Sequence, residues 1–208
     1  NKENQISGHL HIVTPDSICE EMVNSRYFDF HSKYPLISIR FSTADTTAMF
    51  DMLDRNEADL IITLDCHSYH KDYIIAKEEK LPIHFVTNSN SKFAGQKGLS
   101  IRDITNEPFV LTEYGQGYRR AFDSELAKRS IDITPVLEIG RTDMITSVLA
   151  KSNMISFLPD FVTKPLVEAG VLCYLDISDM NIEIWKQLIY HKNKWISRSL
   201  RALIDYIK

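Results

Sequence analysis

One uninterrupted run, from Phe30 to Thr63, constrains the fold more than any other part of the chain. It reads FHSKYPLISIRFSTADTTAMFDMLDRNEADLIIT. Residues 37–41 alternate between apolar and polar side chains, which predicts a strand, and residues 48–53 carry the apolar stripe of a helix. The apolar run at 58–64 is typical of a strand covered on both faces. This order of strand, helix and strand predicts a parallel α/β sheet with right-handed crossovers.

A further strand and helix precede this run. Residues 9–14 alternate as a strand does, and Thr14-Pro15-Asp16-Ser17 then opens a helix that must end before Pro35. We expect Thr14 to cap this helix and Pro15 to occupy its first position, where no amide hydrogen is needed.

The middle of the chain predicts a second α/β unit, and the last strand and helix return to the first. The middle contains strand-like and helical stretches at residues 73–76, 81–87, 107–112, 118–129, 135–139, 143–150, 154–158, 161–167 and 171–175. A strand at 183–191 and an amphipathic helix at 197–207 close the chain. If that last strand pairs with the first unit, the chain crosses twice, which creates a hinge and a cleft.

Bulk properties exclude several classes of protein. The chain has 208 residues and a net charge of -4, whereas gripping nucleic acid needs a basic face. Its three cysteines are far apart, which suits a reducing, cytoplasmic compartment. No apolar stretch is long enough to span a membrane, and the polar start is expected to be a linker left by a cut rather than a signal peptide.

Several segments together resemble the effector-binding domain of LysR-type transcriptional regulators. The matching segments are GHLHIV, FHSKYP, LISIRF, MFDMLDRNEADLIIT, SIRDITNEPFVL and FLPDFVTKPLVEAGVLCYL, and the similarity covers about residues 6–208. Two departures stand out. Asn56 replaces the small residue usual in its turn, and the run from Val148 to Pro159 lacks both of the family's glycines. We expect Asn153 to accommodate the turn there.

The resemblance implies a fold like that of type 2 periplasmic binding proteins, an α/β structure of two Rossmann-like lobes joined by a hinge with two crossings. Residues 1–6 would be a linker, residues 7–78 plus 177–208 lobe I, and residues 79–176 lobe II. It further implies a homodimer, a higher oligomer of the full-length protein, and a winged helix-turn-helix domain outside this chain that binds the DNA. The expected function is to bind a metabolite in the cleft between the lobes and thereby to control that domain.

Three polar turns follow predicted strands, at the edge where α/β sheets bind ligands and helix N-termini offer free amides. They lie around residues 14–17, 42–45 and 142–143, where the family usually meets its effector. Because helix N-termini attract negative charge, we expect an anionic effector. The candidate contacts are Thr14, Pro15, Ser17, Ser42, Thr43, Asp65, Tyr114, Gly115, Arg141 and Thr142. The alternative interpretation makes the threonines mere helix caps, the Tyr114–Gly115 segment a plain turn and Arg141 a solvated side chain.

Other activities have less support. The loop at residues 65–70 contains Cys66 and His70, which could reach one ion, but structural zinc generally takes four ligands, so no metal and no cofactor are expected. We find no phosphate loop, nucleophile elbow or dinucleotide fingerprint, so the chain is not expected to be an enzyme. A solute-binding protein of a transporter is the alternative function, and an enzyme on the same fold is a third.

Overall fold

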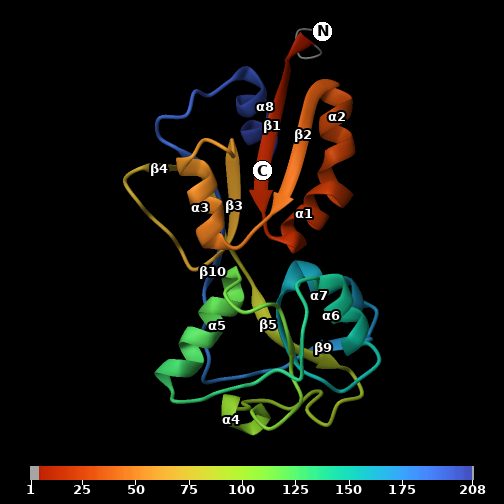
Figure 1. Ribbon diagram of the computed structural model, residues 1–208. Coiled ribbons are helices and arrows are strands. Elements are labelled where there is room, and N and C mark those ends of the chain that lie inside the picture. Colours follow the sequence, from red (N-terminus) through yellow and green to blue (C-terminus); the bar gives the residue numbers. More distant parts are fainter. Residues whose placement is uncertain (1–4, 208) are drawn as a thin grey trace. The chain divides into compact units, whose positions relative to one another are not determined.

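The computed structural model describes residues 5–207 and contains two compact units (Figure 1). Unit 1 comprises the described chain up to Glu79 together with the part from Trp185 onward, and unit 2 comprises Lys80–Ile184. The sequence alone places these boundaries after residues 78 and 176. No helix among the described residues is both long and apolar enough to cross a membrane.

Unit 1 is built on a five-stranded sheet with the order β2-β1-β3-β10-β4. The strands are β1 (Ser7–Thr14), β2 (Leu36–Thr43), β3 (Leu60–Asp65), β4 (Tyr73–Leu81) and β10 (Ile184–His191). β1 is parallel to both β2 and β3, as the run at 30–63 predicts, and β10 is antiparallel to β3. The three parallel strands therefore end at one edge of the sheet.

Local signals set the ends of the unit 1 helices. These are α1 (Asp16–Met22), a π-helical segment η2 (Val23–Tyr27), α2 (Phe28–Lys33), α3 (Thr46–Asp54) and α8 (Arg198–Tyr206). Pro35 disfavours helical geometry in the residue before it, and α2 ends at Lys33. Asp45 caps α3 by accepting a hydrogen bond from the Ala48 amide, and Asn56 adopts a φ of 54° just past the end of that helix.

Opposite faces of the unit 1 sheet carry different helices. Val13 packs with Met49 and Leu53 of α3 in a cluster that also contains Ile61 and Ile189. Because side chains alternate along a strand, Gly8 faces the other way. A Cβ atom on Gly8 would lie 2.6 Å from the hydroxyl oxygen of Ser199, so α8 packs directly against the backbone of β1.

Unit 2 is built from two smaller sheets. Strands β8 (Ser156–Pro159), β5 (Ile83–Asn88) and β9 (Leu172–Tyr174) form an antiparallel sheet, and β6 (Val110–Leu111) pairs in parallel with β7 (Leu137–Glu138). Its helices are α4 (Ile101–Ile104), α5 (Gly117–Lys128), α6 (Thr142–Leu149) and α7 (Asp160–Glu168). The strands predicted at 107–112 and 135–139 shorten to two residues each. The sequence pattern does not predict α4, a single turn closed by a Ser100–Asp103 capping box.

Three phenylalanines form the centre of unit 2. The rings of Phe85, Phe122 and Phe157 lie 4.9–5.6 Å apart between centroids, within the range of favourable aromatic pairs. The segment before Phe157 needs no glycine, because among the described non-glycine residues only Asn56 and Ser130 adopt a left-handed backbone. The expectation that Asn153 accommodates a special turn is therefore wrong.

Candidate functional site

The candidate residues of unit 1 gather at the carboxyl edge of its sheet. The parallel register of β1 and β2 pairs Val13 with Ser42 and Thr14 with Thr43, so these two strands end side by side. Pro15 and Ser17 follow β1 directly, at the start of α1, and Asp65 is the last residue of β3. The structure thus brings together the unit 1 residues that the sequence nominates.

The three threonines are not helix caps, which corrects the alternative interpretation. The N-cap residues are Pro15 for α1, Asp45 for α3 and Arg141 for α6. Pro15 is therefore not the first helical residue either. Thr14 is fully buried, and its hydroxyl oxygen has no hydrogen-bond partner among the described residues. A buried hydroxyl without a partner is costly, so the Thr14 hydroxyl is a hydrogen-bond donor left available at this edge.

Two other candidates of unit 1 already have partners. The Ser42 hydroxyl lies 2.8 Å from Nε2 of His11, whose Nδ1 lies 2.6 Å from the Glu57 carbonyl oxygen. The buried Asp65 carboxylate accepts hydrogen bonds from the Thr46 hydroxyl at 2.9 Å and from the Cys66 amide at 2.7 Å. The hydrogen bond between Thr46 and Asp65 fixes the start of α3 against the end of β3. His11 is not a predicted site residue, because in the sequence it occupies an ordinary polar position of a strand.

A fully buried glutamine, Gln187, holds the loop after Asp65 by hydrogen bonds. Gln187 accepts from the Ser68 amide at 2.9 Å and donates to the Ser68 carbonyl oxygen at 3.1 Å and to a Glu78 carboxylate oxygen at 2.9 Å. That same oxygen lies 2.8 Å from Nε2 of His67. Hydrogen bonds from Gln187 and His67 lower the pKa of Glu78. His67 is thus part of a local hydrogen-bond network that anchors this loop.

The candidate residues of unit 2 lie on two turns that meet. β6 and β7 pair in parallel, and the turns after them carry Tyr114–Gly115 and Arg141–Thr142 respectively. A Cβ atom on Gly140 would lie 2.9 Å from a carboxylate oxygen of Glu113, so the two turns are in contact. Gly115 has a φ of 84°, which favours glycine, and Tyr114 is 78% exposed.

Arg119, which is not a predicted site residue, connects the elements that carry the two turns of unit 2. Its side chain is buried and donates to the Thr112 carbonyl oxygen at 2.6 Å, to Glu138 at 3.0 Å and to Asp123 at 2.9 Å. These partners lie at the end of β6, in β7 and in α5, so one guanidinium holds the base of both turns. A lone arginine on an amphipathic helix gives no such signal in the sequence.

Arg141 is engaged within its own turn. Its Nε and Nη2 atoms lie 3.1 and 2.6 Å from the two carboxylate oxygens of Asp143. The Arg141 guanidinium and the Met144 amide hold the pKa of Asp143 below its usual range. The expectation of a solvated Arg141 is therefore incomplete, since its guanidinium forms a two-point ion pair.

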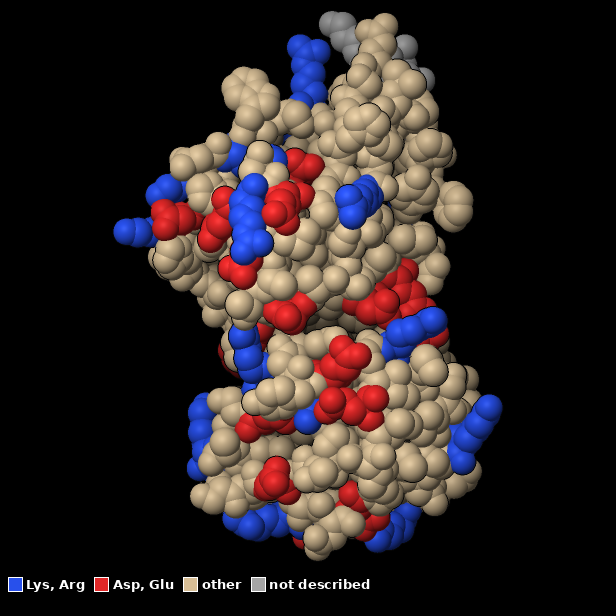
Figure 2. Space-filling view, viewed as in Figure 1, with Lys and Arg blue, Asp and Glu red and all other residues tan. Residues whose placement is uncertain are grey.

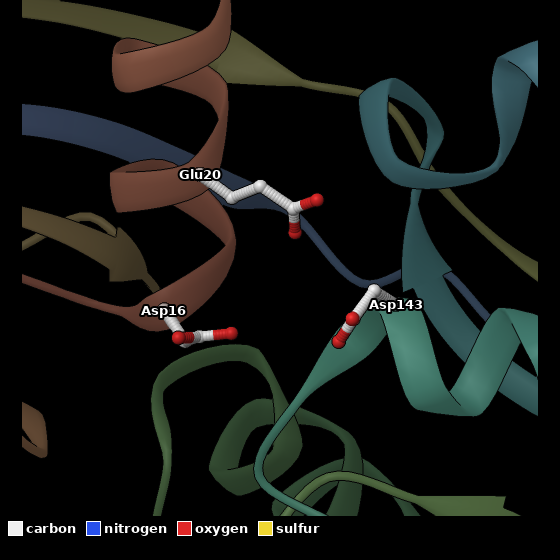
Figure 3. A group of neighbouring side chains, drawn as sticks. All are labelled: Asp16, Glu20 and Asp143. Atoms are coloured by element: carbon white, nitrogen blue, oxygen red, sulfur yellow. The ribbon is translucent and has the colours of Figure 1, made fainter.

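Each helix N-terminus of the candidate site already carries a carboxylate of the chain itself. Asp16 lies in the first turn of α1, Asp45 caps α3, and Asp143 lies in the first turn of α6. Figure 3 shows Asp16 and Glu20 extending from α1, and Asp143 at the start of α6. These carboxylates offset the positive ends of the helices, so the N-termini alone no longer favour an anionic effector.

Comparison with known proteins assigns the family. The family model described as LysR substrate binding domain matches residues 3–208. The uncharacterized HTH-type transcriptional regulator YwqM of Bacillus subtilis is 25% identical over 99% of this chain and 70% of its own length. The HTH-type transcriptional activator CmpR of Synechocystis is 23% identical over 96% of this chain, which spans 65% of that relative.

Solved structures show the same fold. The effector-binding domain of QuiR in complex with shikimate superimposes with a TM-score of 0.75 at 17% identity, and covers 96% of this chain and 95% of its own. The regulatory domain of CcmR from Synechocystis, in complex with 2-PG, gives a TM-score of 0.78 at 21% identity with the same coverage. The cofactor-binding domain of Cbl gives 0.80 at 16% identity, over 98% of this chain and 89% of its own. The chain belongs to the LysR substrate binding domain family and has the type 2 periplasmic-binding-protein-like fold of its effector-binding domains.

Proposed function

We propose that this chain senses a small molecule on behalf of a LysR-type regulator, through the residues gathered at the edge of the unit 1 sheet and on the two turns of unit 2. The observation that carries the proposal is the pair of parallel strands that end in register at Thr14 and Thr43, with the Thr14 hydroxyl buried and without a partner. A ligand that accepts a hydrogen bond from this hydroxyl would recover the cost of burying it.

The remaining candidates divide into two roles. Pro15, Ser17 and Thr43 provide effector contacts in unit 1, where Ser42 and Asp65 hold the surrounding backbone. Tyr114 offers an exposed aromatic face in unit 2, and Arg141 and Thr142 offer a charged group and a hydroxyl. Bound effector favours one arrangement of the protein over another, and this preference changes the geometry of an attached DNA-binding domain.

The relatives support the regulatory interpretation. They are HTH-type transcriptional regulators, and solved relatives of the same fold contain shikimate or 2-PG. Such regulators are not enzymes, and we infer that this chain is none. A regulator acts where the DNA is, which supports a cytoplasmic location. None of these relatives is a transporter component, which disfavours the solute-binding alternative.

We further infer that the domain forms a homodimer through the edge of the unit 1 sheet. β2 is the terminal strand of that sheet, and its first residue, Leu36, is 56% exposed. Phe28, the first residue of the preceding helix α2, is 73% exposed. An exposed edge strand with large apolar side chains invites pairing with another chain. The charges on the visible face of each unit are of both signs and interspersed, in keeping with DNA contact through a different domain (Figure 2).

A thermal-shift screen of metabolites tests the sensing function. A ligand present at 100 times its Kd stabilises the folded state by about 2.7 kcal/mol, which is several degrees in Tm for a domain of this size. Thr43→Ala should then reduce the shift produced by a hit, while the Tm without ligand changes little, because Thr43 is exposed and caps no helix. An unchanged affinity in this variant would remove Thr43 from the site.

A further inference from the structure

Lys186 places a positive charge inside unit 1, on the face of the sheet opposite α3. It belongs to β10, and its side chain is only 8% exposed. Ile189 of the same strand packs in the α3 cluster, and side chains alternate along a strand, so Lys186 points to the other face. A lysine is seldom buried unless a negative charge accompanies it, so the partners of this ammonium group decide its role.

Two glutamates from different elements share this ammonium group. Nζ of Lys186 lies 3.2 Å from a carboxylate oxygen of Glu79, in β4, and 3.8 Å from Oε2 of Glu21, in α1. The Glu79 side chain is 52% exposed and keeps contact with water, whereas Oε2 of Glu21 is buried and has no hydrogen-bond partner among the described residues. The charge of Lys186 therefore offsets the burial of the Glu21 carboxylate.

The same contact joins α1 to the sheet. Oε1, the other carboxylate oxygen of Glu21, lies 3.3 Å from the Ser25 hydroxyl and 3.9 Å from Nε of Arg26. Both of these residues belong to η2, which continues α1, so their contacts with Glu21 stay within one helical stretch. Oε2 instead reaches Lys186 in β10 and links the helix to a strand.

α1 has few local means of holding its position. It contains seven residues, its N-cap residue Pro15 makes no side-chain capping hydrogen bond, and its last turn has no basic residue. A helix this short depends on tertiary contacts, here those of the buried Ile18 and Met22 and of Glu21. Its start also carries the proposed effector contacts Pro15 and Ser17, so whatever fixes α1 also fixes these contacts.

Lys186 and Glu79 also lie where the chain passes between its two units. Unit 1 runs to Glu79, and the chain re-enters it at Trp185, one residue before Lys186. β4 and β10 are neighbours in the sheet, so the ion pair between Glu79 and Lys186 joins the strand that leaves unit 1 to the strand that returns. Lys186 thus connects α1 to both crossing strands.

We propose that Lys186 is a positioning residue, whose ammonium group holds α1 and the effector contacts at its start against the two strands that connect the units. The proposal rests on the proposed function, because it takes α1 to be part of the effector site. A displacement of α1 by bound effector then changes the distance between Glu21 and Lys186. It thereby acts on the strands that enter and leave unit 2.

Hydrogen exchange of the isotope-labelled domain, without any ligand, provides the test. The amides of Cys19 and Val23 are hydrogen-bonded at the two ends of α1, and the Met49 amide of α3 is the reference for overall stability. Lys186→Met leaves Oε2 of Glu21 buried without its positive partner, so the α1 amides should exchange about tenfold faster relative to Met49. Adding Glu21→Gln removes the unmatched charge and should bring the rates back to those of Glu21→Gln alone.

Glu79→Gln is the matched control. It removes the carboxylate nearer to Lys186, but from β4 rather than α1, and should change the α1 rates by less than about twofold. The proposal is overturned if Lys186→Met leaves the α1 rates unchanged, if Glu79→Gln accelerates them equally, or if the double variant remains as fast as Lys186→Met.

Folding of the variants also gives a decisive result. If Lys186→Met does not fold but its combination with Glu21→Gln does, the unmatched Glu21 charge is the cause, which supports the proposal. If neither folds, the fold needs Lys186 for a reason other than Glu21, and the proposal is wrong.

The outcome is distinguishable from a failure of the sensing function, because the exchange experiment needs no effector. If a metabolite stabilises the domain but Lys186→Met does not change α1, only the role of Lys186 is wrong. If α1 responds as expected and no metabolite stabilises the domain, Lys186 holds α1 in place but sensing is not what this contact serves.

Discussion

Thr14 and Thr43 are register partners at the ends of two parallel strands, yet one is fully buried and the other is exposed. The difference arises because β1 is flanked on both sides whereas β2 is the edge strand of the sheet. The buried hydroxyl has no partner, so its cost is a measurable property of the free protein.

Replacing Thr14 by valine should stabilise the free domain and weaken effector binding at once. Valine keeps the branched shape and removes a buried hydroxyl that lacks a partner, for an expected gain of about 1 kcal/mol in the free energy of unfolding. The thermal shift caused by an effector should shrink, because the donor it would use is gone. Urea unfolding and thermal shift with a screen hit measure the two effects.

Thr63→Val is the matched control for this variant. Thr63 also has a buried hydroxyl without a partner, in the middle of β3 rather than at the end of a strand. It should gain similar stability and keep the full effector shift. If both variants lose the shift equally, the effect comes from the sheet and not from the Thr14 hydroxyl.

Arg119→Met should destabilise unit 2 by about 2–3 kcal/mol, because a nearly isosteric apolar side chain leaves Glu138, Asp123 and the Thr112 carbonyl oxygen without their donor. The loss is below that of a fully buried pair, since both carboxylates retain contact with water. Chemical denaturation followed by exchange of unit 2 amides measures it. Arg120→Met, on the exposed side of the same helix, should change stability by no more than about 0.5 kcal/mol.

Tyr73 should make stability depend on pH in the alkaline range. Burial, together with the hydrogen bond from its hydroxyl to Asp54 at 2.7 Å, raises the pKa of Tyr73 from 10.0 to about 12. A raised pKa in the folded state favours the protonated phenol, so this contribution is complete below pH 10 and is lost between pH 10 and about 12.

Tyr73→Phe isolates this contribution. The stability difference between the natural chain and the variant should shrink as the pH rises through that window, and ultraviolet titration should show one late-ionising tyrosine that the variant lacks. A tyrosine that ionises near pH 10 at this position would contradict the expectation.

If the domain dimerises through the edge of the unit 1 sheet, negative charges introduced at that edge should separate the subunits. Leu36→Asp together with Phe28→Asp places two carboxylates on the exposed apolar surface, and sedimentation should show a change from dimer to monomer. Val136→Asp, at a similarly exposed position in unit 2, should leave the mass unchanged. A natural chain that sediments as a monomer at high concentration would exclude the interface.

The spacing of apolar residues in the sequence predicted the strands and helices that bury one side or both sides along their whole length. Ile37, Ile39 and the apolar run of β3 defined a parallel sheet correctly, because burial on a sheet leaves a period in the sequence. β6 and β7 contain two residues each, which is too short for an alternating pattern, so the sequence could not predict where they begin and end. The capping role given to Thr14 was wrong because Thr14 is the last residue of β1, and Pro15 is the N-cap residue of α1.

The candidate site likewise has a part that the sequence could predict and a part that it could not. Its backbone positions follow from strand order and could be nominated from the sequence, as Thr43 and Thr142 show. The partners of its side chains could not, because they depend on tertiary packing. Arg119 reaches three separate elements, and Gln187 binds a loop more than a hundred positions away. The pairing of Arg141 with Asp143 spans two residues but becomes visible only in the turn geometry.

The place of β10 in the sheet has a consequence for biosynthesis. It lies between β3 and β4, although all the other strands of unit 1 precede it by many residues in the chain. Unit 2 is continuous and can fold while translation continues, but the sheet of unit 1 stays open until β10 has left the ribosome. A chain that ends before Trp185 and has been released from the ribosome should therefore have a folded second unit and a first unit that chaperones still recognise.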